Sequence, residues 1–281
     1  MEDNYMNLSI SEQLTYSTVR IECQYADGNL GTGTGFFFRL LDNKETGTHI
    51  PVVITNKHVI NGAIKGRLLF TKAQENNEPN DREHFNVYFN NFESLWRKHP
   101  DPQVDLCAMP IAPSLSEAEK KKEKLFFISL DMSLLPTQGQ LDQFSALEEI
   151  LMIGYPNGIW DSVNNKPIFR KGITATNPNF DYNGKKEFMI DAACFPGSSG
   201  SPVFIFNEGG YRDKRGNTYL GMTRVILMGV LYAGPQYTTT GEIRIIDVPT
   251  SQRPIAISTI PNNLGLVIKS ERIVELEKLF K

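Results

Sequence analysis

The segment 194–204 is where residue types and spacing first point to chemistry. It places Ser198, Ser199 and Ser201 among glycine and proline residues and then enters an apolar stretch. In a glycine-rich turn, backbone N–H groups can point into a common space and stabilise a developing negative oxygen. A serine hydroxyl in the same turn can attack the carbonyl that becomes that oxygen. The pattern also suits an ordinary turn between strands, so the chemistry depends on partners elsewhere in the chain.

A serine nucleophile needs a general base, in practice a histidine that a carboxylate holds in place. The four histidines all precede the serine segment: His49, His58, His84 and His99. This order excludes the α/β-hydrolase arrangement, in which the histidine follows the serine. His58 follows the apolar stretch 50–55 and precedes a turn, which predicts a position at the rim of a barrel. A histidine at such a position can equally be structural.

Two aspartates lie near residue 100. We expect Asp105 at the start of a strand over 105–109, whereas Asp101 lies between Pro100 and Pro102 in a loop. An isolated aspartate before a strand is commonly a cap or turn residue. The occurrence of His58, Asp105 and Ser199 together, in this order, is what favours a catalytic interpretation over three unrelated structural ones.

The elements that must position these residues are predominantly strands. Alternating or continuous apolar segments bounded by turn residues predict strands at 18–23, 36–41, 50–55, 66–71, 84–89, 105–109, 149–153, 169–175, 187–192, 201–206, 223–232 and 264–268. Only the last residues are convincingly helical, because Ile273, Leu276 and Phe280 share one helix face. Many short strands in two successive halves predict an all-β fold of two antiparallel barrels or sandwiches with a C-terminal α-helix.

The polar and charged run 112–124 separates the two halves. We therefore expect an N-terminal extension at 1–16, a first β-barrel with the interdomain linker at 17–124, and a second β-barrel with the C-terminal helix at 125–281, together one unit.

Composition excludes several classes of protein. The 281 residues carry a net charge of -3 and are 40% hydrophobic, which gives no basic surface for nucleic acid or an anionic membrane. The first twenty residues do not resemble a signal peptide, and the longest apolar run, 225–233, is too short to span a bilayer. The widely separated Cys23, Cys107 and Cys194 favour reduced thiols in the cytoplasm over a disulfide framework. We expect no metal and no cofactor.

Four ordered segments resemble the signature segments of the chymotrypsin/trypsin-like serine protease family. They are Gly31–Phe36, Thr55–Val59, Val104–Leu106 and Gly197–Pro202. Three further segments resemble the bacterial Deg-type branch of that family, without a PDZ domain: 153–156, 191–193 and 264–268. The resemblance covers residues 17–281 and implies a chymotrypsin-like fold of two antiparallel six-stranded β-barrels with a C-terminal helix.

The resemblance also implies catalytic roles. Ser199 matches the nucleophile, His58 the general base and then acid, and Asp105 the carboxylate that orients the histidine. The N–H groups of Gly197 and Ser199 match the oxyanion hole. Ser198 and Ser201 are rival serines, but the family's nucleophile stands two residues after the first glycine and three before the proline. The expected function is that of a serine endopeptidase acting on polypeptides through an acyl-enzyme intermediate.

The family fold also predicts which residues bind the substrate. The expected set is Ala193, Cys194, Leu231, Tyr232, Ala233, Gly234 and Leu266. The strand 228–234 would pair with the substrate backbone as an added strand. Because the wall residues Ala193, Cys194, Leu231 and Leu266 are uncharged, we expect an apolar or small residue before the scissile bond, and not Arg or Lys.

Ser198 stands where secreted digestive members have an aspartate that binds a newly cleaved N-terminus, and no Ile-Val-Gly-Gly-like start is present. We therefore expect control by a regulatory protein partner, an inactive resting loop or narrow specificity, with 156–166 and 208–217 as candidate mobile segments. One alternative is a catalytically silent module of the same fold used for peptide binding or assembly. A small-ester hydrolase is disfavoured, because nothing in the sequence resembles a lid.

Overall fold

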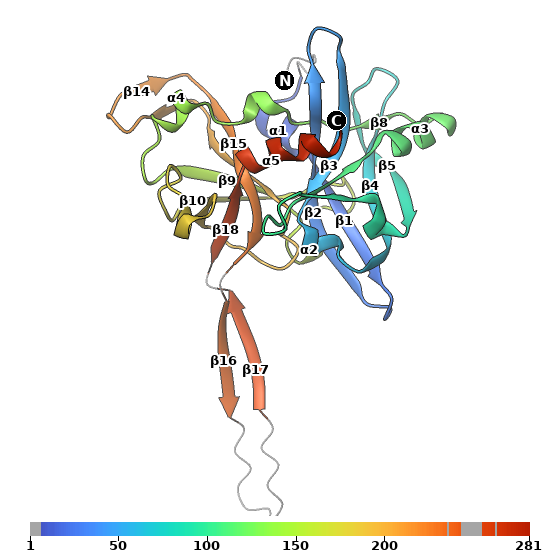
Figure 1. The fold of residues 1–281 in the computed structure, drawn as a ribbon. Coiled ribbons are helices and arrows are strands. Elements are labelled where there is room, and N and C mark those ends of the chain that lie inside the picture. The colour runs from blue at the N-terminus through green and yellow to red at the C-terminus, as the bar shows by residue number, and fades with distance from the viewer. Residues whose placement is uncertain (1–6, 235, 243–254, 262) are drawn as a thin grey trace, which may run out of the picture.

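The computed structural model describes residues 7–234, 236–242, 255–261 and 263–281. It contains two groups of strands side by side, with the short C-terminal helix lying across them (Figure 1). In these ranges no helix is both long enough and apolar enough to cross a membrane.

The first half forms one eight-stranded antiparallel sheet in the order β5-β4-β1-β2-β3-β7-β6, with β8 paired to β4. Its strands are β1 (Thr18–Tyr25), β2 (Leu30–Asn43), β3 (Thr48–Thr55), β4 (Ala63–Ala73), β5 (Pro79–Asn90), β6 (Arg97–Lys98), β7 (Cys107–Pro110) and β8 (Leu125–Phe126). Because β8 pairs with β4, the first sheet extends past the predicted boundary at 124/125.

The second half forms a closed six-stranded barrel in the order β10-β11-β18-β15-β12-β9. Its strands are β9 (Glu149–Gly154), β10 (Ile168–Thr174), β11 (Glu187–Asp191), β12 (Pro202–Asn207), β15 (Arg224–Ala233) and β18 (Leu264–Lys269). These are the six strands predicted for this half, so the prediction of a six-stranded barrel is confirmed here. The first half differs, because the two-residue strands β6 and β8 are too short to leave an alternating pattern in the sequence.

Two strand pairs lie outside these sheets. The pair β13 (Gly210–Arg212) and β14 (Thr218–Leu220) falls within the segment 208–217 and its flank, and the pair β16 (Gln236–Glu242) and β17 (Ile255–Pro261) projects away from the barrel between β15 and β18 (Figure 1).

The helices are short. The α-helices are α1 (Ile10–Thr15), α2 (Lys57–Ile60), α3 (Ala112–Lys120), α4 (Gln138–Leu141) and α5 (Glu271–Val274). The 3₁₀ turns are η1 (Phe92–Leu95), η2 (Met132–Leu134), η3 (Pro156–Gly158), η4 (Tyr182–Gly184) and η5 (Glu275–Leu279). The predicted C-terminal helix is thus one α-helical turn that continues as a 3₁₀ turn, with Ile273 and Leu276 buried beneath it.

The central strand β2 is buried on both faces, and this joins the two halves. Alternate side chains of a strand point to opposite faces, so Phe37 enters the core of the first sheet while Phe36 and Phe38 enter a second core. That second core also contains Ile153 and Phe204 from the barrel. The apolar run at 36–38 therefore fixes the first sheet against the barrel, with the ends of β3, β9 and β12 brought to one region.

Candidate active site

His58 lies on the one-turn helix α2, directly after β3. The buried apolar residues of β3 hold one side of this turn, and the buried Val59 and Ile60 hold the other. The histidine side chain remains 47% exposed. It is therefore presented to solvent from a rigid turn at the end of a buried strand, as the sequence predicted.

Asp105 lies next to His58. Its Oδ2 is 2.5 Å from His58 Nδ1, and its Oδ1 accepts a hydrogen bond from the His58 backbone N–H at 3.1 Å. The Asn56 side chain also donates to the Asp105 carbonyl oxygen at 2.8 Å. A carboxylate can only accept, so it fixes the proton of the neutral ring on Nδ1 and leaves Nε2 free to accept a proton.

The position of Asp105 corrects the prediction that it starts a strand. Strand β7 begins only at Cys107, and Asp105 lies in an irregular segment between the buried Val104 and Leu106. The local sequence pattern could not reveal this, because the hydrogen bonds of the Asp105 carboxylate go to His58, a residue 47 positions away.

The loop that carries Ser199 rests on the first half of the chain. The Thr34 N–H donates to the Ser199 carbonyl oxygen at 2.9 Å, and Thr55 Oγ1 donates to the Thr34 carbonyl oxygen at 2.6 Å. A Cβ on Gly200 (φ +87°) would collide with that carbonyl and with the Thr55 hydroxyl. Since Thr55 precedes His58 by three residues, Ser199 and His58 are carried by adjoining backbone. No hydrogen bond joins their side chains in the described residues.

The backbone N–H groups of Gly197 and Ser199, on either side of Ser198, have no acceptor within the described part of the chain. The Asn157 N–H donates to the Pro196 carbonyl oxygen at 2.5 Å. The C=O and N–H of a trans peptide point in opposite directions, so this bond turns the Gly197 N–H away from Asn157. Thr34 Oγ1 donates to the Gly197 carbonyl oxygen at 2.9 Å. The loop therefore offers two free donors, as an anion-binding turn requires.

Burial distinguishes the three serines. Ser198 is 1% exposed and Ser201 is 0% exposed, and neither hydroxyl has a hydrogen-bond partner among the described residues. The Ser201 hydroxyl points at the backbone of Gly154, where an added Cβ would collide with it. Ser199 is only partly buried. It is therefore the serine of this loop that a substrate can approach.

The predicted substrate-binding residues fall into two groups. The partly buried Cys194 lies against Gly265, where its Sγ would be 2.7 Å from an added Cβ, and close to Gly234; Ala193 precedes it. Burial raises the pKa of the Cys194 thiol to about 11. Ala233 and Leu266 are paired between β15 and β18.

Leu231 does not present its side chain as a pocket wall, as was expected from the sequence. Leu231 is 3% exposed and packs in the barrel core, and its carbonyl oxygen accepts from the Gly200 N–H at 2.8 Å. The Tyr232 hydroxyl donates to Glu187 Oε2 at 3.0 Å. Alternation along β15 directs Leu231 inward, so its backbone supports the loop while its side chain fills the barrel.

Sequence reasoning missed several residues at this site. No role was assigned to Thr34, Asn157 or Arg170, because each acts on residues far away in the chain. The Arg170 guanidinium lies over the Phe195 ring at 5.0 Å and places a positive charge beside Cys194, where the sequence suggested an uncharged environment. The left-handed Asn157 (φ 50°) within a Pro-Asn-Gly turn was the one detectable feature.

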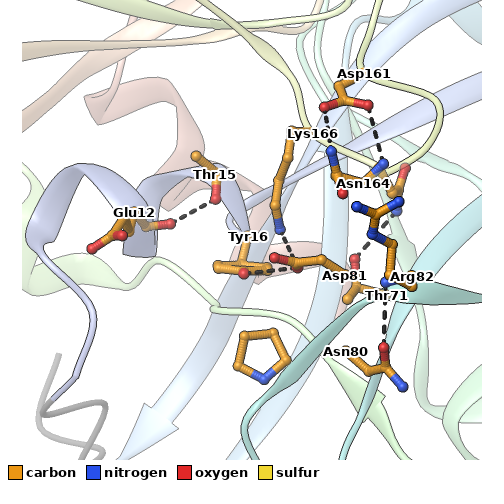
Figure 2. A network of polar contacts seen from close by, with 12 residues as sticks. Glu12, Thr15, Tyr16, Thr71, Asn80, Asp81, Arg82, Asp161, Asn164 and Lys166 are labelled. Atoms are coloured by element: carbon orange, nitrogen blue, oxygen red, sulfur yellow. Dashed lines mark hydrogen bonds and ion pairs between the residues drawn. The ribbon is translucent and has the colours of Figure 1, made fainter.

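The segment 156–166, predicted to be a candidate mobile segment, has several anchors on the first half. Figure 2 shows Lys166 reaching Asp81, with Tyr16 bonded to the same carboxylate. The Lys166–Asp81 distance is 2.6 Å, and Lys166 Nζ lies 3.5 Å from the Tyr16 ring centre. Burial lowers the pKa of Lys166. Asn157, which donates to the Pro196 carbonyl oxygen, belongs to this segment, so the anchors of the segment also hold that support.

No group of three or more His, Cys, Asp or Glu side chains suited to a metal ion occurs within the residues that the structure describes.

Comparison with known proteins places this geometry in a family. Residues 33–210, more than half of the chain, match the trypsin-like peptidase domain. No curated protein matches the sequence. Among solved structures, the chain is similar to the HtrA-type protease AlgW with tripeptide, at 16% identity and a TM-score of 0.45, covering 94% of this chain and 60% of that one.

Two further structures have comparable similarity. The Rv3671c protease from M. tuberculosis in its active form is 16% identical, with a TM-score of 0.42, and the match covers 96% of this chain and 84% of that one. Deg5 is 17% identical, with a TM-score of 0.43, and the match covers 83% of this chain and 87% of that one. On the strength of the domain match, the chain belongs to the family of trypsin-like serine peptidases.

Proposed function

We propose that this chain is a serine endopeptidase that hydrolyses peptide bonds through a Ser199–His58–Asp105 triad and an acyl-enzyme intermediate. The observation that carries the proposal is the 2.5 Å contact between His58 Nδ1 and Asp105 Oδ2. It is linked to the partly buried Ser199 because Thr55, just before His58, bonds to Thr34, which bonds to the Ser199 backbone. A histidine held in this tautomer is what a serine nucleophile requires.

The reaction begins when Ser199 Oγ attacks the carbonyl carbon of the scissile peptide and His58 Nε2 takes the hydroxyl proton. The carbonyl oxygen becomes negative and accepts hydrogen bonds from the N–H groups of Gly197 and Ser199. Asp105 stabilises the imidazolium that forms and does not itself take the proton.

The tetrahedral intermediate collapses when His58 passes its proton to the leaving amine, which departs and leaves an ester on Ser199. Water then attacks the ester with His58 again as the base, and the acid product leaves with Ser199 restored. The free N–H groups of Gly197 and Ser199 support this step as well as the first, since the same oxygen becomes negative twice.

The substrate backbone pairs with the end of β15 at 232–234, and the side chain before the scissile bond lies near Cys194. The neutral thiol and the small Ala193 favour an apolar or small residue there. The Arg170 charge over Phe195 disfavours Lys and Arg at the same position, because like charges repel.

The setting of the reaction belongs to the same proposal. The thiols of Cys23, Cys107 and Cys194 are unpaired, which is compatible with a reducing cytoplasm. In that compartment an unrestrained endopeptidase would damage other proteins. We therefore expect a regulatory protein partner, or narrow specificity, to limit cleavage.

The test is covalent labelling with a fluorophosphonate, which reacts with an activated serine. The wild type is expected to label at Ser199, whereas Ser199→Ala and His58→Ala lose the label because the nucleophile or its base is gone. Ser201→Ala is the matched control: it removes a buried hydroxyl without a hydrogen bond from the same loop and should retain labelling. A folded wild type that stays unlabelled would instead favour a catalytically silent module.

A further inference from the structure

The segment 99–105, which carries Asp105, is organised around Asp101. The Asp101 carbonyl oxygen accepts from the Val104 N–H at 3.2 Å and from Lys57 Nζ at 3.0 Å. Its carboxylate Oδ1 accepts from the Gln103 N–H at 2.9 Å. These bonds replace the ladder hydrogen bonds that a strand would provide, and they set the curvature of the backbone immediately before Asp105.

The other carboxylate oxygen of Asp101 reaches the C-terminal helix. Arg272 Nη2 lies 2.5 Å from Asp101 Oδ2, and Arg272 Nη1 lies 2.8 Å from Glu275 Oε1. The arginine side chain is 14% exposed. A guanidinium that is partly shielded from water and engages two carboxylates has a fixed orientation, so it ties α5 and η5 to the segment 99–105.

A buried histidine completes the contact. The His99 side chain is 0% exposed, its Nδ1 accepts from the Asp101 N–H at 3.0 Å, and its Nε2 lies 3.5 Å from Glu275 Oε2. Burial lowers the pKa of His99, which favours the neutral ring. Because Nδ1 accepts, the ring proton is on Nε2, facing Glu275. The segment 99–105 thus contacts the C-terminal helix in two ways. The Asp101 carboxylate binds Arg272, and the Asp101 backbone N–H binds His99, which faces Glu275.

We infer that Asp101 and Arg272 are positioning residues that hold Asp105 in hydrogen-bond reach of His58. The inference rests on the proposed triad. Asp101 is four residues before Asp105, and Pro102 restricts the backbone between them, while Pro100 restricts it on the other side of Asp101. Rotation of this short segment would move Asp105 Oδ2 away from His58 Nδ1. Neither positioning residue touches the substrate.

The experiment compares the wild type with Arg272→Met and Asp101→Asn. Each variant is expected to lower kcat about tenfold with KM unchanged, since displacement of a catalytic group affects the transition state and not ground-state binding. The double variant should lose little more than either single variant, because both changes break one contact. Arg272→Lys, which keeps the charge but not the planar fork, should recover part of the loss.

A spectroscopic readout separates positioning from general destabilisation. The proton shared by His58 and Asp105 in a short hydrogen bond resonates far downfield in the proton NMR spectrum. This signal should be present in the wild type and weakened or lost in Arg272→Met at a temperature where melting curves show both proteins folded.

The matched control is Glu271→Gln, on the same helix. It breaks the exposed Lys186–Glu271 pair at 2.9 Å without touching the segment 99–105, and should leave both kcat and the downfield signal unchanged. A folded Arg272→Met protein with wild-type kcat and an intact signal would overturn the inference alone. A wild type that neither labels with fluorophosphonate nor cleaves peptides would overturn the proposed triad, and the inference with it.

Discussion

The proposed base, His58, and the proposed nucleophile, Ser199, are held in different ways. His58 and Asp105 bond directly to each other and are backed by a buried strand on one side and the C-terminal helix on the other. The Ser199 loop contains Gly197 and Gly200 at positive φ, and its shape depends on neighbours. His58 and Asp105 are therefore joined by a direct hydrogen bond in addition to support from outside, whereas the shape of the Ser199 loop depends on its neighbours.

The external supports of the loop come from both halves of the chain. Thr34 holds the carbonyl of Gly197 and the backbone of Ser199, and Asn157 holds the carbonyl of Pro196. Loss of one support should therefore change the oxyanion donors while leaving His58 and Asp105 in place. The variants below test this difference, in order of decreasing expected effect.

The largest loss of activity is expected from a change in the His58–Asp105 pair. Asp105→Asn should lower kcat by about 10⁴, because the amide no longer favours the required tautomer or stabilises the imidazolium. Steady-state cleavage of fluorogenic peptides measures the loss, and a melting curve checks the fold. A reduction of less than tenfold in a folded protein would contradict the assignment of Asp105.

The next effect concerns the oxyanion donors. Gly197→Ala should lower kcat by about 10²–10³, since an added Cβ lies 2.6 Å from the Tyr155 carbonyl oxygen and φ +85° disfavours a side chain. Gly139→Ala is the control, because nothing lies near an added Cβ there. If both variants cleave peptides like the wild type, the Gly197 N–H does not stabilise the transition state.

Thr34→Val tests the support from the first half. It keeps the shape of the side chain but removes the acceptor of the Tyr155 N–H and the donor to the Gly197 carbonyl, so kcat should fall about tenfold and stability by about 1–3 kcal/mol. Thr34→Ser retains both bonds and should behave like the wild type. Kinetics and denaturant unfolding measure the two effects; equal values for Val and Ser would show that the hydroxyl is not a support.

Lys166→Met tests the more distant anchor drawn in Figure 2. Without the Asp81 contact, the segment 156–166 should be cut faster by an added protease, and kcat should fall a few-fold through Asn157. Lys171→Met, which breaks the exposed pair with Glu149 at 3.0 Å, is the control. If the added protease cuts the segment 156–166 of Lys166→Met at the wild-type rate, the Lys166–Asp81 contact does not hold this segment against the Ser199 loop.

The smallest effect is expected from modification of Cys194 near neutral pH. Since burial raises the pKa of this thiol to about 11, the reactive thiolate is scarce at neutral pH and increases only as the pH approaches that value. Alkylation by iodoacetamide, followed by mass spectrometry, should therefore be slow at pH 7 and accelerate in alkali. Rapid, complete alkylation of Cys194 at pH 7 would show that the pocket is open to water.

The same contrast explains what could be predicted from the sequence. Strand patterns and short motifs are local, so the six barrel strands were predictable, as were the places of His58 and Ser199 in the chain. Thr34 and Asn157 act on a loop far away in the sequence, and nothing around them marks that contact. The same applies to Asp101, whose partner Arg272 is 171 residues away. The local sequence pattern gives no information about contacts between residues so far apart in the chain.

Two predictions that rested on the local sequence pattern alone are corrected by the structure. Asp105 precedes an apolar run and so resembled a strand residue, but its bonds to His58 keep it outside β7. Leu231 resembled a pocket wall, but alternation along β15 places it in the barrel core. In both cases contacts with residues distant in the sequence, and not the neighbouring residues in the chain, decide the orientation of the side chain.

The contact between Asp101 and Arg272 also orders events during synthesis. Asp101 leaves the ribosome 171 residues before Arg272, which at common elongation rates is about 10 to 30 s. Throughout that interval the segment that carries Asp105 lacks its tie to the C-terminal helix. If Asp101 and Arg272 position Asp105 as inferred, the proposed peptidase would reach full activity only after most of the chain has been made.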